Sequence, residues 1–347
     1  MTKFNLNNLV RANVKAMKPY SSARDEYVSD GSEMVFLDAN ENPFENGVNR
    51  YPDPQQRSLK SIIAAQKGID ESHILLGNGS DEVLDLLFRA FCQPKQDNII
   101  TLPPTYGMYT VLSNLNEIEE RKVVLQADFQ PDVDAILKAV DAHSKLLFIC
   151  SPNNPTGNLI AIKKVKQLLE TFQGIVVIDE AYIDFADQST WVNELSNYPN
   201  LIVTQTLSKA YGLAGIRLGV CFAAAEVIAV LNKIKPPYNV NELTQKAAME
   251  RLMDEKGVEN EIKAILEERS GLIAALQNVD FVKTIYPTEA NFVLAKVDDA
   301  TKRYNELLAK GIVIRNRTTQ ALCENTLRFT VGTPEENKLL IAALKSL

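Results

Sequence analysis

The amino-acid sequence predicts an α/β fold with a mainly parallel sheet in a large domain, followed by a smaller α+β domain. The chain has 347 residues, and at roughly 150 residues per domain this length suggests about two domains. Short apolar runs alternate with helical patterns through the middle of the chain, and the pattern changes after about Pro236. Together these observations place a domain boundary in the second half of the sequence.

Six apolar runs are expected to form the strands of the large domain. Each is short, continuous and rich in Val, Ile and Leu, as strands buried on both faces should be. Helical patterns lie between several of them, for example at residues 83–91 and 162–171. Because strand and helix alternate, we expect mainly parallel pairing with helices flanking the sheet. The six runs are residues 99–102, 123–125, 146–150, 175–179, 201–207 and 218–222.

The chain after residue 240 is expected to form the small domain. Residues 242–278 have the composition of a long helix, with many Ala, Glu, Lys and Leu. The Pro-Pro-Tyr sequence before them is the expected hinge, because proline ends both helices and central strands. The strands expected after this helix are residues 281–285, 291–295, 312–315 and 326–331. We therefore expect an N-terminal arm or lid at residues 1–46, a large domain at 47–240 and a small domain at 241–347.

The composition is that of a globular protein, with 46% hydrophobic and 23% charged residues. The net charge of −7 argues against a general nucleic-acid binder, although it leaves room for a local basic pocket. The N-terminus lacks the apolar core of a signal peptide, and no apolar run has the length of a membrane span. We therefore expect a cytoplasmic protein.

Cysteine and histidine suggest no chemistry in this sequence. No two cysteines form a CxxC pair, so we expect buried, reduced thiols rather than disulfides or a zinc site. The two histidines have no neighbouring ligand residues, so no metal is expected. These residues are Cys92, Cys150, Cys221, Cys323, His73 and His143.

Lys209 is the first candidate for catalysis, in the segment TQTLSKAYGLAGIRLG. A single lysine among hydroxyl residues is usually a solvated surface residue. This one lies between two apolar runs, and a partly desolvated lysine has a lowered pKa and attacks carbonyl groups. Thr206, Ser208 and Arg217 nearby supply hydrogen-bond donors that suit a phosphate.

Asp179 is the second candidate, at the end of the buried run IVVID. Ligand-binding groups of α/β folds lie at the carboxyl ends of strands, and a buried carboxylate there calls for a cationic partner. Tyr182, three residues later, could reach the same ligand. The alternative is that Asp179 caps the following helix.

Two turns supply further candidates. The segment SPNNPTG at 151–157 contains Asn154, whose amide either bonds its own backbone or, held by Pro155, bonds a ligand oxygen. The segment GNGSD at 77–81 precedes a helix, and its free backbone N–H groups suit an anion. Alternatively, Ser80 caps that helix.

An aromatic residue and three arginines complete the candidates. Tyr106 follows a strand, where its ring either stacks on a flat ligand or fills the core. Arg328 is an unusual charge within the run TLRFTV, so it is either an edge residue or a clamp for an anion. Arg315 and Arg317 raise the same two alternatives.

Taken together, these motifs resemble the fold-type I pyridoxal-phosphate enzymes, the aspartate aminotransferase family. The order NPTG, DEAY, SKAYGLAGIRLG and LRFTVGT is similar to that family over most of the chain. The segments LDANENPF, RYPDP, LLGNGSDE and RFTVGTPEEN resemble, more narrowly, its histidinol-phosphate aminotransferases. This resemblance implies a homodimer that exchanges an amino group between L-histidinol phosphate and 2-oxoglutarate in L-histidine biosynthesis.

The resemblance also implies a role for each matching residue around pyridoxal 5′-phosphate. Lys209 would bind the cofactor aldehyde as a Schiff base and then move the substrate proton, and Asp179 would pair with the ring nitrogen. Tyr182 and Asn154 would bond the phenolic oxygen of the ring, and Tyr106 would stack on it. The other cofactor-binding residues would be Gly79, Ser80, Asp81, Thr206, Ser208 and Arg217.

The substrate and the second subunit would meet further residues. Arg328 would bind the carboxylate of glutamate or the phosphate of histidinol phosphate, helped by Tyr20 and Arg315. Asn40 would lie near the substrate as part of the N-terminal lid. Tyr51 would reach the cofactor phosphate of the neighbouring subunit.

Three alternatives to this function have a similar core. An aromatic or broad-specificity aminotransferase differs only in its substrate, and a phosphothreonine-type decarboxylase releases CO2. Product analysis separates these enzymes. A regulator without turnover is the non-enzyme alternative, and it would not need Lys209, Asp179 and Arg328 together.

Overall fold

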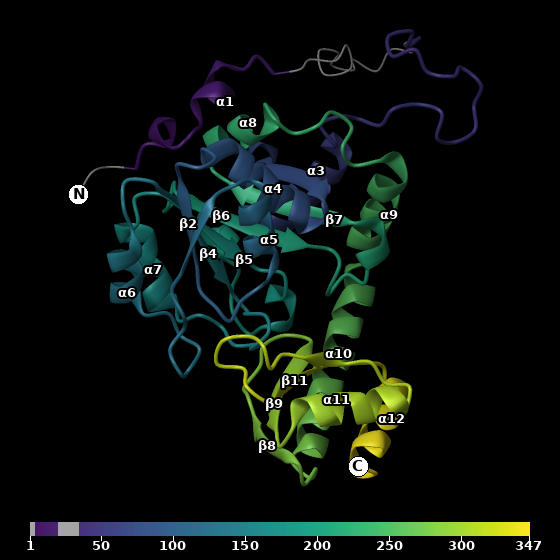
Figure 1. Ribbon diagram of the computed structural model, residues 1–347. Helices are drawn as coiled ribbons and strands as arrows, with labels where there is room; N and C mark the ends of the chain where they lie inside the picture. Colours follow the sequence, from purple (N-terminus) through teal and green to yellow (C-terminus); the bar gives the residue numbers. More distant parts are fainter. Residues whose placement is uncertain (1–3, 20–34) are drawn as a thin grey trace.

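The computed structural model describes residues 4–19 and 35–347, which form a larger and a smaller body (Figure 1). The larger body contains a seven-stranded sheet and the smaller body a four-stranded sheet. Helices flank both sheets. The expected α/β fold with a smaller α+β part is therefore confirmed.

The large sheet has the strand order β1-β7-β6-β5-β4-β2-β3. Its strands are β1 Ile74–Asn78, β2 Asn98–Thr101, β3 Glu119–Lys122, β4 Ser144–Cys150, β5 Ile175–Asp179, β6 Leu201–Thr206 and β7 Leu218–Ala223. Strands β2 to β6 pair in parallel, whereas β7 runs antiparallel to both of its neighbours. The carboxyl ends of the central strands therefore meet at one edge of the sheet.

Helices cover both faces of this sheet. They are α1 Ala12–Ala16, α3 Arg57–Lys67, α4 Gly79–Phe91, α5 Met108–Leu115, α6 Val133–Ala139, α7 Ile162–Thr171, α8 Ala225–Asn232 and α9 Glu242–Met253. Because successive strand residues point to opposite faces, Leu147 and Phe148 of β4 enter two different apolar cores. Leu147 packs in the core formed with α3, α6, α7 and α9, and Phe148 in the core formed with α1, α4, α5 and α8.

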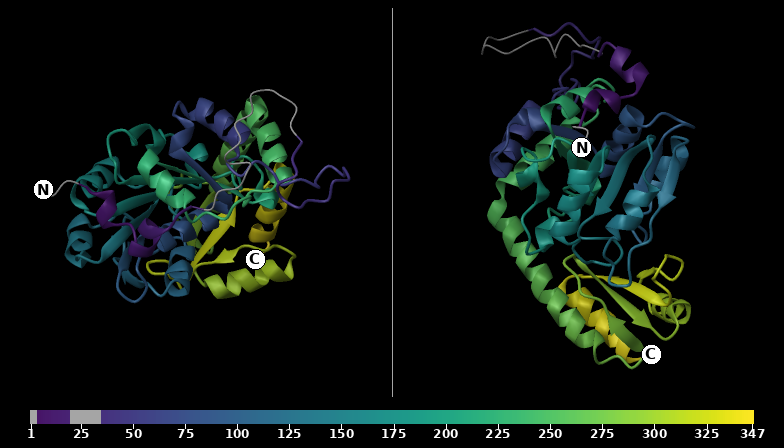
Figure 2. Two further views of the ribbon diagram at one scale, coloured as in Figure 1. Left: turned by 90° about the horizontal axis from the view of Figure 1, so that it is seen from above. Right: turned by 90° about the vertical axis from the view of Figure 1, so that its left-hand side faces the viewer.

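The smaller body contains an antiparallel sheet with the order β10-β11-β9-β8. Its elements are α10 Glu255–Leu276, β8 Val282–Ile285, β9 Phe292–Val297, α11 Ala300–Ala309, β10 Arg315–Asn316, β11 Thr326–Thr330 and α12 Pro334–Lys345. Leu327 and Phe329 of β11 pack against the three helices on one face. Arg328, between them in the strand, therefore belongs to the opposite face. Helix α10 runs from the larger body along the smaller one (Figure 2).

Several elements differ from the sequence-based expectation. The strand expected at 123–125 lies at β3, whose charged side chains suit an edge strand that pairs only with β2. Strand β1 was not predicted from the sequence. Its apolar run is short and continues directly into the glycine-rich turn at 77–81. The strand expected at 312–315 is shorter and lies later in the structure, as β10 at Arg315–Asn316. The helix expected at 242–278 is divided into α9 and α10 because Asp254 caps the second helix, accepting a hydrogen bond from the Gly257 N–H at 3.1 Å.

All four cysteines are buried and free, as expected. No helix among the described residues has the length and apolar character needed to cross a membrane. Within the same residues, no group of three or more His, Cys, Asp or Glu side chains is arranged to hold a metal ion.

The first prediction concerns Phe148, which is fully buried and stacks on Tyr109 with ring centroids 4.7 Å apart. Phe148→Ala should lower the free energy of unfolding by about 3–5 kcal/mol, because the cavity it leaves cannot collapse between the sheet and its helices. Urea unfolding followed by circular dichroism measures this change. Leu339→Ala is the control, since Leu339 is 67% exposed, and its loss should stay under about 0.5 kcal/mol. A similar loss in both variants would contradict the prediction.

Candidate active site

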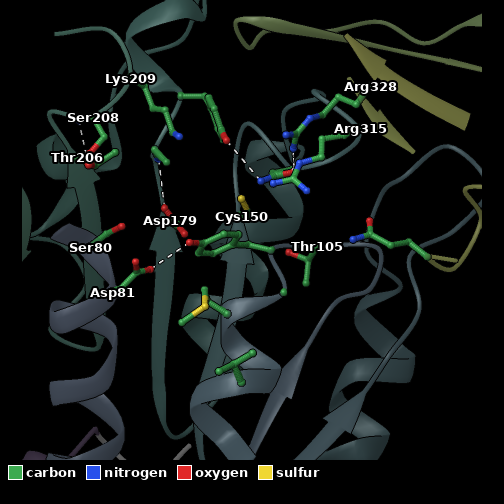
Figure 3. Close-up of a pocket in the computed structure, with 18 of the residues that line it drawn as sticks. Ser80, Asp81, Thr105, Cys150, Asp179, Thr206, Ser208, Lys209, Arg315 and Arg328 are labelled. Carbon is green, nitrogen blue, oxygen red and sulfur yellow. Dashed lines mark hydrogen bonds between the residues drawn. The ribbon is translucent and has the colours of Figure 1, made fainter. Parts of the chain in front are cut away.

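A cavity of about 510 Å³ lies at the carboxyl ends of the parallel strands, between the larger and the smaller body (Figure 3). Such a position is where open α/β sheets bind ligands. The cavity is lined by Ser80, Asp81, Thr105, Tyr106, Gly107, Met108, Val111, Cys150, Asn154, Asp179, Ala181, Tyr182, Thr206, Ser208, Lys209, Arg217, Arg315, Arg317, Gln320 and Arg328. Most of the side chains singled out in the sequence are therefore brought together.

Asp179 forms part of the floor of this cavity. It is the last residue of β5 and is only 2% exposed. Burial raises the pKa of its carboxyl group, while hydrogen bonds from the Tyr109 hydroxyl (2.8 Å) and the Ala181 N–H (3.2 Å) act in the opposite direction. Among the described residues, no basic side chain forms an ion pair with it. The hydrogen bond from the Ala181 N–H is the local cap expected if Asp179 served only to cap the segment after β5. The carboxylate also borders the cavity, so capping is not its only contact.

Lys209 projects into the same cavity from the loop that joins β6 and β7 (Figure 3). Its amine lies 5.8 Å from the centroid of the Tyr182 ring. Burial lowers the pKa of this amine, and the positive charge of Arg328 lowers it further, whereas Asp179 opposes the shift. The neutral form, which attacks carbonyl groups and accepts protons, is therefore favoured relative to an exposed lysine.

Asn154 connects Tyr182 of the larger body to Arg328 of the smaller one. Its amide donates a hydrogen bond to the Tyr182 hydroxyl at 3.4 Å, and its oxygen accepts one from the Arg328 guanidinium at 2.5 Å. The neighbouring Asn153 instead bonds within and around the turn, to the Pro104 carbonyl (2.8 Å) and the Thr156 hydroxyl (2.7 Å). Because Asn153 stabilises the turn, Asn154 is left to face the cavity.

The start of α4 forms a region suited to an anion. Asn78 is the N-cap and makes no side-chain cap, so the alternative that Ser80 caps this helix is wrong. Uncapped N–H groups of a first helical turn attract anions. Gly79 has φ +73° there, and a Cβ at that position would lie 2.7 Å from the guanidinium of Arg217. Glycine thus lets Arg217 approach the helix start closely.

Asp81 holds two of the cavity side chains. Its carboxylate accepts a hydrogen bond from the Tyr106 hydroxyl at 3.0 Å and lies 3.4 Å from Arg217. The Tyr106 ring also packs edge-on against Tyr109, with centroids 5.7 Å apart. Tyr106 therefore borders the cavity with its ring fixed at both ends, as a stacking residue should be.

Three expected residues in the described part of the chain are not among those that line this cavity: Gly79, Asn40 and Tyr51. Asn40 and Tyr51 border a second cavity of about 570 Å³, where Tyr51 stacks on Tyr238 with ring centroids 4.6 Å apart. The segment that carries them extends away from the larger body in Figure 1. Tyr20 lies outside the described residues. Their expected contacts with substrate and cofactor therefore stay predictions.

Sequence reasoning missed Tyr109, whose hydroxyl bonds Asp179. It occupies a helical position three residues after Tyr106, so its aromatic ring indicated only core packing. Thr105, Cys150 and Gln320 were also missed as lining residues. The three-residue spacing between Tyr106, just before α5, and Tyr109 within it was the one signal that could have linked Tyr109 to the cavity.

Comparison with known proteins places this chain in a family. The sequence profile described as aminotransferase class I and II matches residues 33–344. The chain belongs to this family. Within it, the chain is 64% identical to a histidinol-phosphate aminotransferase of Flavobacterium johnsoniae and 59% identical to one of Christiangramia forsetii. Both alignments cover all of this chain and at least 99% of the relative.

Solved structures of two histidinol-phosphate aminotransferases share the fold. The histidinol-phosphate aminotransferase from Clostridium acetobutylicum superposes with a TM-score of 0.80 at 28% identity, over 86% of this chain and 90% of that one. The enzyme from Sinorhizobium meliloti, solved in complex with pyridoxal-5′-phosphate, has a TM-score of 0.79 at 24% identity, over 86% and 82% of the chains. The latter similarity supports the fold alone.

Glu180, beside Asp179, is a buried carboxyl group outside the cavity lining. It accepts hydrogen bonds from the Thr190 hydroxyl (2.5 Å), the Trp191 N–H (2.7 Å) and the Gln205 amide (2.8 Å). Burial raises the pKa of this carboxyl group to about 7, although these hydrogen bonds oppose the shift. Glu180 therefore ties the loop after β5 to the neighbouring strand β6.

The second prediction follows from the raised pKa of Glu180. Between its ordinary pKa of 4.5 and about 7, the folded protein binds more protons at this site than the unfolded chain, so stability falls as pH rises. Glu180→Gln removes this dependence. The free energy of unfolding of Glu180→Gln minus that of the unsubstituted protein should therefore rise by about 3 kcal/mol from pH 4.5 to pH 7.5. Urea titrations at several pH values measure it, with Glu267→Gln on the exposed face of α10 as control. A difference independent of pH would count against the prediction.

Proposed function

We propose that this chain is a pyridoxal-phosphate-dependent histidinol-phosphate aminotransferase. It would convert L-histidinol phosphate and 2-oxoglutarate into imidazole-acetol phosphate and L-glutamate, a step of L-histidine biosynthesis. The observation that carries the proposal is one cavity containing a lysine of lowered pKa, a buried carboxylate and several arginines. Relatives named histidinol-phosphate aminotransferase, 50–64% identical over nearly the whole chain, support it.

The residues of the cavity fit the cofactor. Asp179 is a buried carboxylate without an ion-pair partner among the described residues, and it suits the protonated nitrogen of a pyridine ring. The uncapped first turn of α4 and the guanidinium of Arg217 suit the phosphate. Tyr106 would border the ring, and Asn154 and Tyr182 would face its phenolic oxygen. Gly79, Ser80, Thr206 and Ser208 would complete the phosphate end, and Asp81 would lie near the cofactor, paired with Arg217.

Pyridoxal phosphate supplies an electron sink that makes the amino-bearing carbon of the substrate acidic. The protein supplies the base: the Lys209 amine would take this proton and return it to another carbon. An amine with a lowered pKa suits this task, because its neutral form is populated nearer to neutral pH. Asp179 would keep its negative charge beside the ring nitrogen, supported by the Tyr109 hydrogen bond. Tyr182 would lie close to the proton path, beside Lys209.

The arginines would bind the substrate anions. Arg328 is fixed by its bond to Asn154 and by the Phe292 ring, whose centroid lies 4.9 Å from the guanidinium carbon. Glutamate and histidinol phosphate differ in shape, and a planar guanidinium suits either a carboxylate or a phosphate. Arg315 would assist, as would Tyr20 from the N-terminal lid.

The assembly and compartment are further parts of the proposal. The half-exposed Tyr51 would reach the phosphate site of a second subunit in a homodimer, with Asn40 near the substrate. The division into an arm at 1–46, a cofactor-binding domain at 47–240 and a small domain at 241–347 is proposed, with α9 at the start of the last segment packed in the core of the larger body. Four free, buried thiols suit the reducing cytoplasm.

The third prediction tests the catalytic lysine. Lys209→Ala should lose the visible absorption of the lysine-bound cofactor and reduce kcat by about 10²- to 10⁴-fold or more, because no amine replaces the base. Absorption spectra and steady-state kinetics measure both effects. Lys310→Ala, at an exposed lysine after α11, is the matched control and should keep both. Full activity in Lys209→Ala would exclude the proposed mechanism.

The fourth prediction tests the substrate. The kcat/KM for histidinol phosphate should exceed that for phenylalanine, tyrosine or leucine by at least about 100-fold, because a phosphate has more charge and more acceptor oxygens for the arginine-lined wall than a carboxylate has. Amino transfer to 2-oxoglutarate without release of CO2 should accompany it. Equal values would instead identify an aromatic or broad-specificity aminotransferase, and release of CO2 would identify a decarboxylase.

A further inference from the structure

We infer that Arg317 is a third guanidinium for the phosphate of the substrate and that it gives the cavity its preference for a phosphate over a carboxylate. The inference rests on the proposed function and deepens it. The resemblance implied that Arg328, Arg315 and Tyr20 meet the substrate anion, and the sequence left Arg317 as either an edge residue or an anion clamp. Arg317 lines the same cavity.

The strand register places the three arginines on one surface. Arg315 of β10 is directly opposite Arg328 of β11 in their antiparallel pairing. The Arg317 N–H continues this pairing with a hydrogen bond of 2.9 Å to the Thr326 carbonyl. Because side chains two residues apart on a strand share a face, Arg315 and Arg317 point to the same side. All three arginines therefore border the cavity from the smaller body.

This arrangement is electrostatically unfavourable without an anion. Like charges directly opposite each other on adjacent strands destabilise a sheet. Among the described residues, no carboxylate forms an ion pair with Arg315, Arg317 or Arg328. The Nε atoms of Arg317 and Arg328 are buried, and neither has a hydrogen-bond partner among the described residues. Burial lowers the pKa of Arg317, and Arg315 lowers it further. Burial and then Arg317 likewise lower the pKa of Arg328 to about 10.

The side chains that line the whole cavity also carry an excess of positive charge. Five basic and two acidic side chains line it. Asp81 is paired with Arg217, and Asp179 lies on the floor with the Tyr109 hydroxyl. The excess positive charge therefore lies along the wall that the three arginines form.

The charge and the number of oxygens of the bound anion explain why three guanidinium groups favour a phosphate over a carboxylate. A phosphate monoester carries a charge of about −1.5 to −2 at neutral pH and presents three acceptor oxygens, whereas a carboxylate carries one charge and two oxygens. Two guanidinium groups are enough for a carboxylate. A third adds more to the binding of the phosphate, because it meets an additional charge and an additional oxygen. Arg317 is thus assigned as a specificity-determining residue rather than a catalytic one.

The fifth prediction tests this assignment on the holoenzyme, in which the phosphate of the cofactor already occupies the site at α4. Isothermal titration with inorganic phosphate, and separately with acetate, measures anion binding without turnover. Arg317→Gln should weaken phosphate binding by about 10- to 100-fold and acetate binding by less than about threefold. Arg317→Lys should recover part of the phosphate affinity, since it restores the charge but not the planar fork. Arg89→Gln, at an arginine on the exposed side of α4, is the control and should change neither.

Kinetics on the same variants provide a second measurement. Arg317→Gln should raise the KM for histidinol phosphate by a similar factor and leave the kcat/KM for glutamate within about threefold. Unchanged phosphate binding and unchanged KM would overturn the inference. Equal losses for glutamate and histidinol phosphate, or loss of the cofactor absorption, would overturn it as well, because they indicate a structural role. The proposed function fails separately if the unsubstituted enzyme itself shows no preference for histidinol phosphate over phenylalanine.

Discussion

The buried carboxylate of Asp179 is the constraint on which the rest of the site depends. It ends a strand in the middle of the large sheet, where lost hydration disfavours its charge. The Tyr109 hydroxyl and the Ala181 N–H compensate part of this loss. The Tyr109 ring is held in turn by stacking on Phe148. The apolar core of the larger body therefore positions the polar floor of the cavity.

The two bodies meet around the cavity through polar and aromatic contacts. Asn154 bonds both Tyr182 and Arg328, and the Phe292 ring packs against both of these residues. Arg328 lies on a strand of the smaller sheet, whereas Asn154 and Tyr182 lie in loops of the larger body. Any movement of one body relative to the other would therefore displace the arginines relative to Lys209. The arginines proposed to bind the anion and the lysine proposed to move the proton therefore lie on two bodies that Asn154 connects.

The distribution of charge explains how an acidic protein presents a basic cavity. The chain carries a net charge of −7, yet the cavity has more basic than acidic lining residues. Its negative side chains lie at the floor and at α4, and three of its five positive ones lie on the smaller body. A ligand with a cationic ring nitrogen at one end and an anion at the other would match both regions. The overall charge, which averages over the surface, does not reveal this separation.

The sequence by itself determined the α/β class, the mainly parallel sheet and the residue types at the strand ends, because buried strands and the turns after them follow from local patterns. The family resemblance of its motifs also implied that Lys209, Asp179 and Asn154 surround one cofactor, and the structure brings all three to one cavity. Only the tertiary structure showed that Tyr109 bonds Asp179 and that Arg317 lies beside two other arginines, with no carboxylate of residues 4–19 or 35–347 paired to it. These features depend on side chains brought within a few ångströms from distant segments. Local patterns specify what a strand or helix buries, but the partners of a charge are set by packing between elements.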